Sequence, residues 1–229
     1  MKKLVVLSGA GMSAESGIKT FRDHDGLWEE YAVHDVATPV AWHKNPGLVL
    51  EFYNQRRRQL YLADPNAGHF ALKELEKFFQ VDIITQNIDD LHERAGSSCV
   101  LHLHGELKKV QSTKNPEYII LLEKKELKLG DTCPLGGQLR PHVVWFGEDV
   151  PNIYAATKII QSADIVIIVG TSLNVYPAAG LLEYVPQKTA IYMVDPKQVN
   201  TSKRELTHIN STAAIGLPFL SKEIINLYA

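Results

Sequence analysis

Five short runs of apolar, largely β-branched residues constrain the fold of this chain more than any other feature. They occupy residues 4–7, 81–84, 100–103, 165–169 and 191–194. Their hydrophobicity is continuous rather than alternating, which is typical of strands buried on both faces of a parallel sheet. Helical patterns lie between them, including one that Asn66 can cap and a last one that Pro218 can start. The alternation predicts an α/β fold with a doubly wound, Rossmann-like parallel sheet.

Two stretches interrupt this alternation of strands and helices. Residues 27–62 contain an apparently helical segment at 49–60, and residues 106–141 are polar apart from one apolar run at 118–122. We expect both stretches to form a smaller lobe, in which the 118–122 run supplies the apolar packing. A chain of 229 residues has room for one substantial core. The main Rossmann-like domain is therefore expected to comprise residues 1–26, 63–105 and 142–229.

The charge balance and the N-terminal segment limit the class of partner. The chain has 24 Lys and Arg against 26 Asp and Glu, which gives no electrostatic reason to expect nucleic acid or an anionic membrane. No apolar stretch approaches the roughly 20 residues that span a bilayer, and residues 1–7 are too short for a signal peptide. We expect a cytoplasmic protein whose two cysteines, Cys99 and Cys133, are free thiols.

A glycine-rich turn follows the first predicted strand. The segment GAGMSA at residues 9–14 fits the G-x-G-x-x-G/A pattern, in which glycines let the backbone approach a pyrophosphate at a helix start. In a hydride-transferring dehydrogenase, a second strand ending in a ribose-binding acid follows about 20 residues later. Here residues 15–23 are instead a polar segment with Phe21 and Arg22, better suited to a loop over a cofactor. This departure disfavours an oxidoreductase.

Polar residues also follow the later predicted strands. Asn87 follows the second run, His104 the third and Thr171 the fourth. Because the carboxyl ends of parallel strands meet at one crevice, these distant residues can line one site. Each has an ordinary structural interpretation as well: Asn87 and Asp89 can cap a helix, His104 can be a hydrogen-bonded polar residue, and Thr171 can be a turn residue. Their joint position at strand ends favours a functional site.

These motifs resemble those of the sirtuin family. The cofactor-loop signature matches residues 9–22, the motif TQNIDDLH lies at 85–92, the catalytic motif HG at 104–105, and the third cofactor segment combines GTS at 170–172 with VYP at 175–177. They occur in family order, and the similarity covers the chain from residue 9 to about 214. The resemblance implies an NAD-consuming protein-lysine deacylase, similar to the bacterial class III type. Its partners would be acylated-lysine proteins or peptides.

The resemblance also implies the reaction. The acyl-lysine carbonyl oxygen attacks the ribose carbon that bears nicotinamide, nicotinamide leaves, and an imidate-linked intermediate forms. His104 would then deprotonate a ribose hydroxyl, a role that suits an imidazole because its ordinary pKa lies near neutral pH. Asn87 would act in catalysis and, with Asp89, hold nicotinamide. The products would be nicotinamide, deacylated lysine and O-acyl-ADP-ribose.

Further residues are assigned to cofactor and substrate by the same resemblance. Phe21 would shield the cleaving bond. The positions that match the family's cofactor-binding residues are Gly9, Ala10, Gly11, Ser13, Ala14, Glu15, Thr20, Phe21, Arg22, Gln86, Asn87, Ile88, Asp89, Gly170, Thr171, Ser172, Asp195 and Ala213. Substrate peptide would dock as an added strand, by main-chain hydrogen bonds, on Val144, Trp145, Phe146 and Gly147.

An acyl-reading pair is predicted in the helix at 49–60. Tyr53 and Arg56 are three residues apart and share a helix face, where a guanidinium fork and a phenol could hold a carboxylate. Taken alone, residues 56–58 could equally form a solvated basic face, with Tyr53 packed in the lobe. The Tyr-x-x-Arg pair resembles that of sirtuins acting on succinyl, malonyl and glutaryl lysine. Ala37 would leave room for the longer acyl chain.

The chain departs from the family at the zinc site. Most sirtuins carry two Cys-x-x-Cys pairs, the tetrahedral ligand set of structural zinc. Only Cys133 of the second pair is present, residues 107–117 offer no first pair, and Cys133 with His142 supplies at most two ligands. We therefore expect no metal site and no zinc.

Three other functions remain open from the sequence. A Rossmann oxidoreductase is supported only by the glycine turn. A catalytically silent NAD-binding module is disfavoured by the intact His104, Asn87 and Asp89. Mono-ADP-ribosyl transfer shares the release of nicotinamide and is compatible with the motifs as a side activity.

Overall fold

The structure is a computed structural model that describes residues 1–19, 31–124, 126–171, 173, 176–197 and 205–229. Its strands are β1 (Lys3–Ser8), β2 (Gln80–Thr85), β3 (Val100–His102), β4 (Gly105–Ser112), β5 (Ile119–Leu121), β6 (Leu139–Val143), β7 (Ile165–Val169), β8 (Ala190–Val194) and β9 (Thr207–Ile209). Its helices are α1 (Gly11–Ala14), α3 (Val33–Val36), α4 (Pro39–Lys44), α5 (Pro46–Leu62), α6 (Ala67–Leu75), α7 (Leu91–Arg94), α8 (Ile153–Ile160), α9 (Ala213–Tyr228) and the 3₁₀ helix η1 (Ala178–Tyr184).

The larger sheet has the strand order of a dinucleotide-binding fold. In the described part of the chain it contains six parallel strands in the order β3-β2-β1-β7-β8-β9. The order reverses between β1 and β7, and ligands of such sheets bind in the crevice beyond the strand ends at this point. The predicted doubly wound sheet is confirmed, and each of the five predicted runs is a strand. Sequence analysis missed the edge strand β9, which has only three residues and one large aliphatic side chain.

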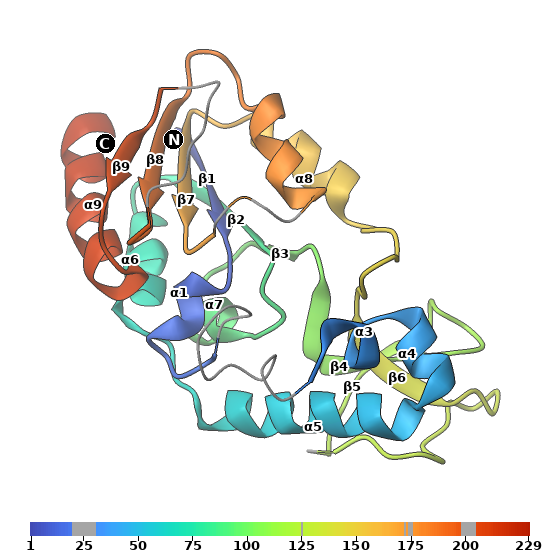
Figure 1. Ribbon diagram of the computed structural model, residues 1–229. Helices are drawn as coiled ribbons and strands as arrows, with labels where there is room; N and C mark the ends of the chain where they lie inside the picture. Colours follow the sequence, from blue (N-terminus) through green and yellow to red (C-terminus); the bar gives the residue numbers. More distant parts are fainter. Residues whose placement is uncertain (20–30, 125, 172, 174–175, 198–204) are drawn as a thin grey trace.

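Both faces of this sheet are covered, which explains the continuous hydrophobicity of its strands. Leu4 and Val6 of β1 point into a core shared with α6 and α9, whereas Val5 and Leu7 point into a core shared with α8 and η1. The exposed fraction of these four side chains is at most 4%. Figure 1 shows α6 and α9 on one side of the strands and α8 on the other.

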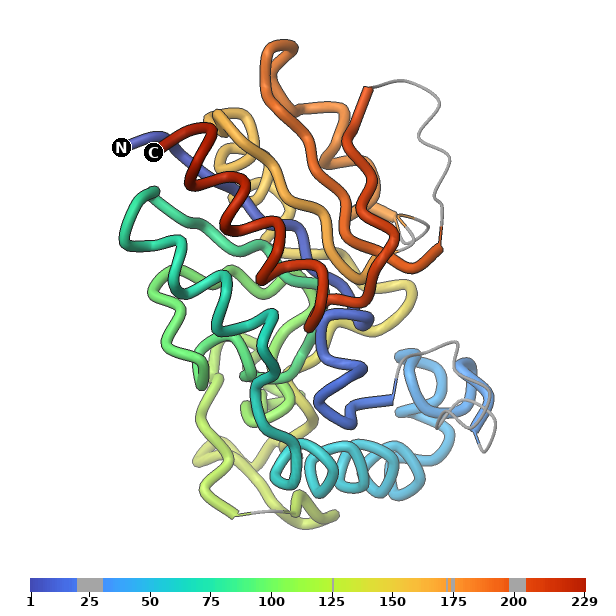
Figure 2. The backbone as a smooth tube through the Cα atoms, turned by 90° about the vertical axis from the view of Figure 1, so that its left-hand side faces the viewer, coloured from blue at the N-terminus to red at the C-terminus, as the bar shows by residue number. Residues whose placement is uncertain are grey.

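The predicted start is correct for α6 and wrong for α9. Asn66 caps α6 as predicted, because its side-chain oxygen accepts a hydrogen bond from the Gly68 N–H at 2.9 Å. The predicted start of the last helix at Pro218 is wrong, since α9 begins at Ala213 and contains Pro218. A proline in the second turn removes one backbone hydrogen bond, which apolar packing of the helix offsets. The end of α9 returns to the N-terminus, and the two chain ends lie close together in Figure 2. Lys2 Nζ donates to the Tyr228 carbonyl at 2.9 Å.

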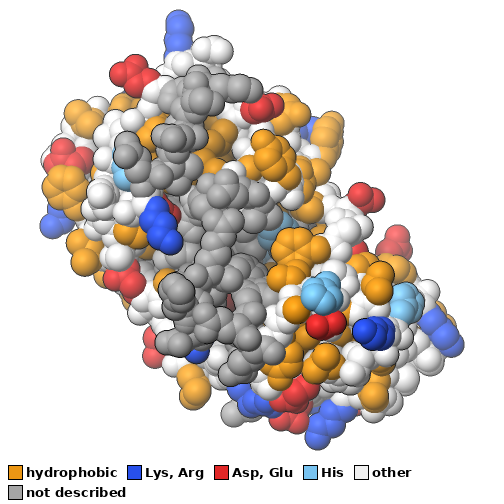
Figure 3. All heavy atoms as spheres, viewed as in Figure 1, with side chains coloured by type: hydrophobic (Ala, Val, Ile, Leu, Met, Phe, Trp, Pro, Cys, Tyr) orange, Lys and Arg blue, Asp and Glu red, His pale blue; other side chains and the backbone are white. Residues whose placement is uncertain are grey.

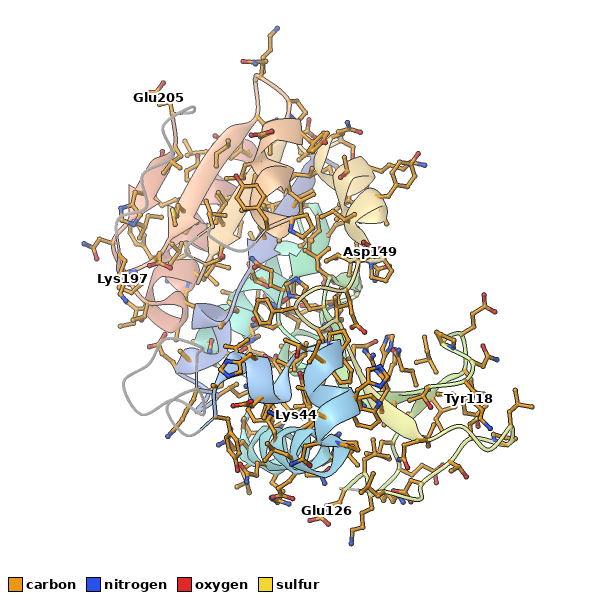
Figure 4. All side chains as sticks on the ribbon, turned by 45° about the vertical axis from the view of Figure 1, so that its right-hand side comes forward. Lys44, Tyr118, Glu126, Asp149, Lys197 and Glu205 are labelled. Atoms are coloured by element: carbon orange, nitrogen blue, oxygen red, sulfur yellow. The ribbon has the colours of Figure 1, made fainter. Side chains whose placement is uncertain are left out.

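A second, antiparallel sheet with the order β5-β4-β6 lies beside the long helix α5. Its core joins Phe52 and Leu60 of α5 to Leu107 and Val110 of β4. The prediction that the 118–122 run packs this lobe is confirmed only at the two ends of the run: Leu122 belongs to the core and Tyr118 packs partly buried against it, whereas the three residues of β5 are exposed. β5 is an edge strand, and Figure 4 shows Tyr118, which directly precedes it, on the side of the small sheet away from the main sheet.

Two further sequence predictions concern the whole molecule. Within the ranges that the structure describes, none of the helices has the length and apolarity needed to cross a membrane. Cys99 is an exposed free thiol and Cys133 a buried one, as predicted. On the face drawn in Figure 3, basic and acidic side chains are interspersed, in agreement with the balanced composition.

Candidate functional site

The glycine turn lies at the point where the strand order reverses. Gly9 follows β1 and donates to the Val169 carbonyl at 3.0 Å, and Gly11 donates to the Gly170 carbonyl at 2.9 Å. A Cβ atom on Gly11 would lie 2.7 Å from the Gly170 Cα, and one on Gly170 would lie 2.2 Å from the Met12 nitrogen. Gly170 also has a φ of 60°, which favours glycine. Direct contact between the two backbones therefore brings the first and third predicted cofactor segments together.

Three buried polar side chains from two of the predicted motifs form a hydrogen-bonded chain. Asn87 Nδ2 donates to Ser13 Oγ at 3.2 Å, and Ser13 Oγ donates to Asp89 Oδ2 at 3.0 Å. The other Asp89 oxygen accepts from the Leu91 N–H at 3.2 Å. Burial raises the pKa of Asp89, while the hydrogen bonds from Leu91 and Ser13 oppose that rise. The chain fixes the orientation of the Asn87 amide, because its N–H₂ group is held by Ser13.

His104 is held in one tautomer beside this cluster. Its Nδ1 lies 3.0 Å from the Gln86 carbonyl oxygen. A carbonyl can only accept, so Nδ1 carries the proton and Nε2 of the neutral ring has its lone pair available. Burial lowers the pKa of His104, and the hydrogen bond to Gln86 opposes that effect. The ring is therefore neutral at pH 7 and has a free basic nitrogen, as a general base requires.

Two further histidines support these residues, and sequence analysis gave neither of them a role. His102 Nδ1 lies 2.8 Å from the Asn87 carbonyl and its Nε2 2.8 Å from Glu93 Oε1. Burial opposes protonation of His102, but the hydrogen bond and charge of Glu93 raise its pKa. His92 Nε2 lies 3.0 Å from the Ser8 hydroxyl at the end of β1. The available signal for His102 was its place at the end of the third predicted run, two residues before His104.

Several other predicted cofactor residues lie at or near the ends of the same strands. Gln86 Nε2 donates to Thr171 Oγ1 at 3.1 Å, which joins the ends of β2 and β7. Glu15 follows α1 and accepts from the Ala214 N–H at 2.7 Å, beside Ala213 at the start of α9. Asp195, a predicted cofactor-binding residue, directly follows β8. Ala10, Ala14 and Ile88 lie within the segments already described. Thr20, Phe21, Arg22 and Ser172 fall outside the described residues.

The predicted peptide-docking segment lies directly beside His104. The Val144 N–H donates to the His104 carbonyl at 3.0 Å, and the Phe146 N–H donates to the Ala37 carbonyl at 3.0 Å. Trp145 is buried, while Phe146 is exposed. Gly147 has a φ of 93° and ends the segment in a turn. The fold thus brings the segment from residue 143 onward next to the proposed base and to Ala37.

Tyr53 and Arg56 lie in the same part of the molecule. Tyr53 belongs to the core that also contains Ala37 and Trp145, and its hydroxyl accepts from Trp145 Nε1 at 3.1 Å. Burial lowers the pKa of Arg56, while electrostatic interactions with Tyr53 and Asp89 oppose that effect. Arg56 therefore lies within electrostatic reach of both the predicted acyl pocket and the predicted nicotinamide site. A guanidinium whose charged form is disfavoured by burial gains stability from a carboxylate ligand.

The run of three arginines divides into three different environments. Arg57 is fully buried and donates from Nε to the Leu107 carbonyl at 2.9 Å, which ties α5 to β4. Arg58 is on the surface and pairs with Glu51 at 2.6 Å and Glu126 at 2.9 Å. The alternative of a uniformly solvated basic face is therefore wrong. Sequence alone could not separate these environments, because adjacent helix positions differ by about 100° in direction.

The residues at the family's zinc site form hydrogen bonds with one another. Ser112 Oγ lies 3.1 Å from Cys133 Sγ and accepts from the Lys114 and Asn115 N–H groups at 3.1 and 3.2 Å. The Gly136 N–H closes the opposite turn onto the Cys133 carbonyl at 2.8 Å. Two facing turns, 112–115 and 133–136, thus join through serine and cysteine side chains. This donor set does not fit structural zinc, which takes four Cys or His ligands.

The second candidate ligand is directed elsewhere. His142 Nδ1 lies 2.7 Å from Gln111 Oε1, within the β4–β6 pairing. Among the described residues, no cluster of three or more His, Cys, Asp or Glu side chains could hold a metal ion.

A Rossmann-type sheet with a glycine turn at its switch point defines a nucleotide-binding α/β protein. The chain belongs to the Sir2 family, whose model matches residues 9–177. A Bacteroides thetaiotaomicron protein named NAD-dependent protein deacylase is 58% identical over 214 residues, which are 91% of this chain and 92% of that protein. A Helicobacter pylori protein of the same name is 54% identical over 228 residues, 99% of each chain.

Solved structures give the same family. A mutant Sir2 homologue in complex with ADP-ribose matches with a TM-score of 0.90 and 38% identity, over 100% of this chain and 95% of its own. A Sir2 protein with a p53 peptide and NAD⁺ matches with a TM-score of 0.79 and 26% identity, over 98% of this chain and 92% of its own. The family predicted from the motifs is confirmed.

Proposed function

We propose that this protein is an NAD-dependent protein-lysine deacylase that prefers acyl groups ending in a carboxylate. The observation that carries the deacylase activity is His104: it is neutral, its Nε2 is free to accept a proton, and its carbonyl bonds the segment proposed to dock the substrate. The relatives named above are deacylases that use NAD. A peptide and NAD⁺ together occupy one structural neighbour.

Each part of the site has one task in this proposal. NAD would supply the ribose carbon that receives the acyl oxygen, and the glycine turn, held against Gly170 by the Gly11 N–H, would bind its pyrophosphate. Asn87, held by Ser13, binds the carboxamide of nicotinamide together with Asp89. His104 Nε2 takes the proton of the ribose hydroxyl that attacks the imidate carbon. The products are nicotinamide, deacylated lysine and O-acyl-ADP-ribose.

The acyl preference rests on Tyr53 and Arg56. They lie one helical turn apart, and Tyr53 shares a core with Ala37, in a region where burial disfavours the charged form of Arg56. A succinyl, malonyl or glutaryl carboxylate would pair bidentately with the guanidinium and accept from the phenol. The Tyr-x-x-Arg pair resembles that of the class III sirtuins, and we propose that the chain belongs to this type.

The activity is tested directly by product analysis. The protein is incubated with NAD and with acetyl-, succinyl- or glutaryl-lysine peptides, and the products are identified by mass spectrometry. We expect nicotinamide and O-acyl-ADP-ribose in equal amounts from the acyl peptides. Production of NADH, or loss of NAD without peptide deacylation, would contradict the proposal.

Replacing Arg56 by methionine should lower kcat/KM on the succinyl peptide by about ten- to a hundredfold, because a charge-assisted hydrogen bond contributes about 1.5–3 kcal/mol. Acetyl-lysine lacks the carboxylate, so its kcat/KM should change much less. Arg58→Met is the matched control, since this neighbour pairs with Glu51 and Glu126 on the surface. Equal losses on both peptides would show that Arg56 supports the fold instead.

Metal analysis of the purified protein should find well under one zinc per chain. The serine–cysteine contact at 3.1 Å and its backbone hydrogen bonds close the two turns where family members carry zinc ligands. Treatment with a strong chelator should therefore leave the melting temperature unchanged. Stoichiometric zinc that survives dialysis would overturn this view of the small lobe.

A further inference from the structure

The indole of Trp145 restricts how the Tyr53 hydroxyl can be used. Trp145 Nε1 lies 3.1 Å from the Tyr53 oxygen, and both side chains are buried, with 2% and 3% exposed. An indole N–H can only donate, so the Tyr53 oxygen accepts in this bond. The phenolic proton must then point away from Trp145. Tyr53 is left as a hydrogen-bond donor on its other side.

The indole of Trp145 is held in place by an ion pair between Arg140 on β6 and Glu148 in the segment after it. The Arg140 guanidinium lies 3.6 Å from the Trp145 ring centroid. Arg140 binds both oxygens of Glu148, at 2.7 and 2.9 Å, and Glu148 Oε2 also accepts from the Trp145 backbone N–H at 2.8 Å. The segment passes between the two sheets, where Figure 4 labels the next residue, Asp149. Cation–π contact and the bidentate pair together leave the indole little rotational freedom.

Tyr53 has the protonation state that a donor needs. Burial raises its pKa to about 12, although the positive charge of Arg56 and the hydrogen bond from Trp145 lower it in part. The phenol therefore keeps its proton throughout the neutral range. Its remaining hydrogen-bonding direction and the Arg56 charge together favour an anionic acceptor.

We propose that Trp145 is a positioning residue for acyl selectivity, which fixes the Tyr53 hydroxyl as a donor to a carboxylate at the end of the acyl chain. The inference rests on the proposed acyl preference and adds to it a residue from the docking segment. Trp145 thereby links peptide docking to acyl recognition, because it belongs to the proposed docking segment and also orients the Tyr53 hydroxyl.

A double-mutant cycle with Trp145→Phe and Tyr53→Phe tests this role on succinyl and acetyl peptides. Phenylalanine keeps an aromatic ring for Arg140 but has no N–H. We expect Trp145→Phe to lower kcat/KM on the succinyl peptide by about two- to twelvefold, the range of one neutral hydrogen bond. In the Tyr53→Phe background, the same change should cost less than about twofold, because its effect passes through the hydroxyl.

The outcomes separate this inference from the proposed function. If Tyr53→Phe selectively loses desuccinylation but the effects of Tyr53→Phe and Trp145→Phe on kcat/KM simply multiply, the positioning role of Trp145 is wrong. The proposed acyl preference would still stand. Equal losses on both peptides in Tyr53→Phe and in Arg56→Met would overturn the acyl preference as well. If Trp145→Phe lowers the melting temperature sharply, 3-benzothienylalanine at position 145 repeats the test, because it replaces only the N–H by sulfur.

Discussion

His104→Ala is expected to lower deacylation turnover by about a hundred- to ten-thousandfold, the contribution typical of a positioned general base. Because Nδ1 donates to the Gln86 carbonyl, Nε2 is the basic nitrogen of the neutral ring, and alanine offers no group that could accept the ribose proton. NAD binding should persist, because the glycine turn and the Ser13–Asp89 bond do not involve the His104 side chain. Turnover is measured by mass spectrometry, and NAD binding by titration calorimetry.

His43→Ala is the matched control for this change, since His43 is an exposed histidine on α4. It should leave turnover within about twofold of the parent, as expected for a surface substitution. Near-normal turnover in His104→Ala would show that another group is the base. Loss of NAD binding in His104→Ala would instead give His104 a part in cofactor binding.

Gly170→Ala is expected to lower the free energy of unfolding by at least about 3 kcal/mol and to weaken NAD binding strongly. The new Cβ would lie 2.2 Å from the Met12 nitrogen and 2.5 Å from the Gly11 carbonyl carbon. These are backbone atoms of the glycine turn, so the collision can be relieved only by moving the turn or β7. Urea unfolding and calorimetry of NAD binding measure the two effects.

Gly130→Ala separates the steric collision from the cost of a positive φ. Gly130 has a φ of 92°, and a Cβ there meets no atom within 4 Å. It should therefore cost only about 1–2 kcal/mol, the penalty of the left-handed conformation, and leave NAD binding unchanged. Similar effects of the two substitutions on stability and on NAD binding would contradict the argument that backbone contact builds the cofactor turn.

The combined site explains how two separate structural units take part in one proposed reaction. The parallel sheet supplies the cofactor turn and the strand-end residues, while α5 and the segment after β6 supply Tyr53, Arg56 and Trp145. The hydrogen bond from Val144 to the His104 carbonyl joins them directly. The proposed base thus lies at the junction of the two sheets.

The sequence by itself determined the main sheet and the motif positions around it. Strands buried on both faces need apolar residues at successive positions, and residues 4–7 and 165–169 meet that need without reference to any partner. The glycine pattern and the strand-end residues are equally local signals. They were enough to predict that Asn87 and His104 approach the same crevice, because parallel strands align their carboxyl ends.

Only the tertiary structure decided what each side chain contacts. Arg57 and Arg58 are adjacent residues of the same type, yet one is buried against β4 and the other pairs on the surface, since α5 packs with only one face. The bond between Tyr53 and Trp145 joins residues 92 positions apart, and no local pattern encodes it. Local propensity and periodicity act over a few residues, whereas hydrogen-bond partners and burial depend on which elements pack together.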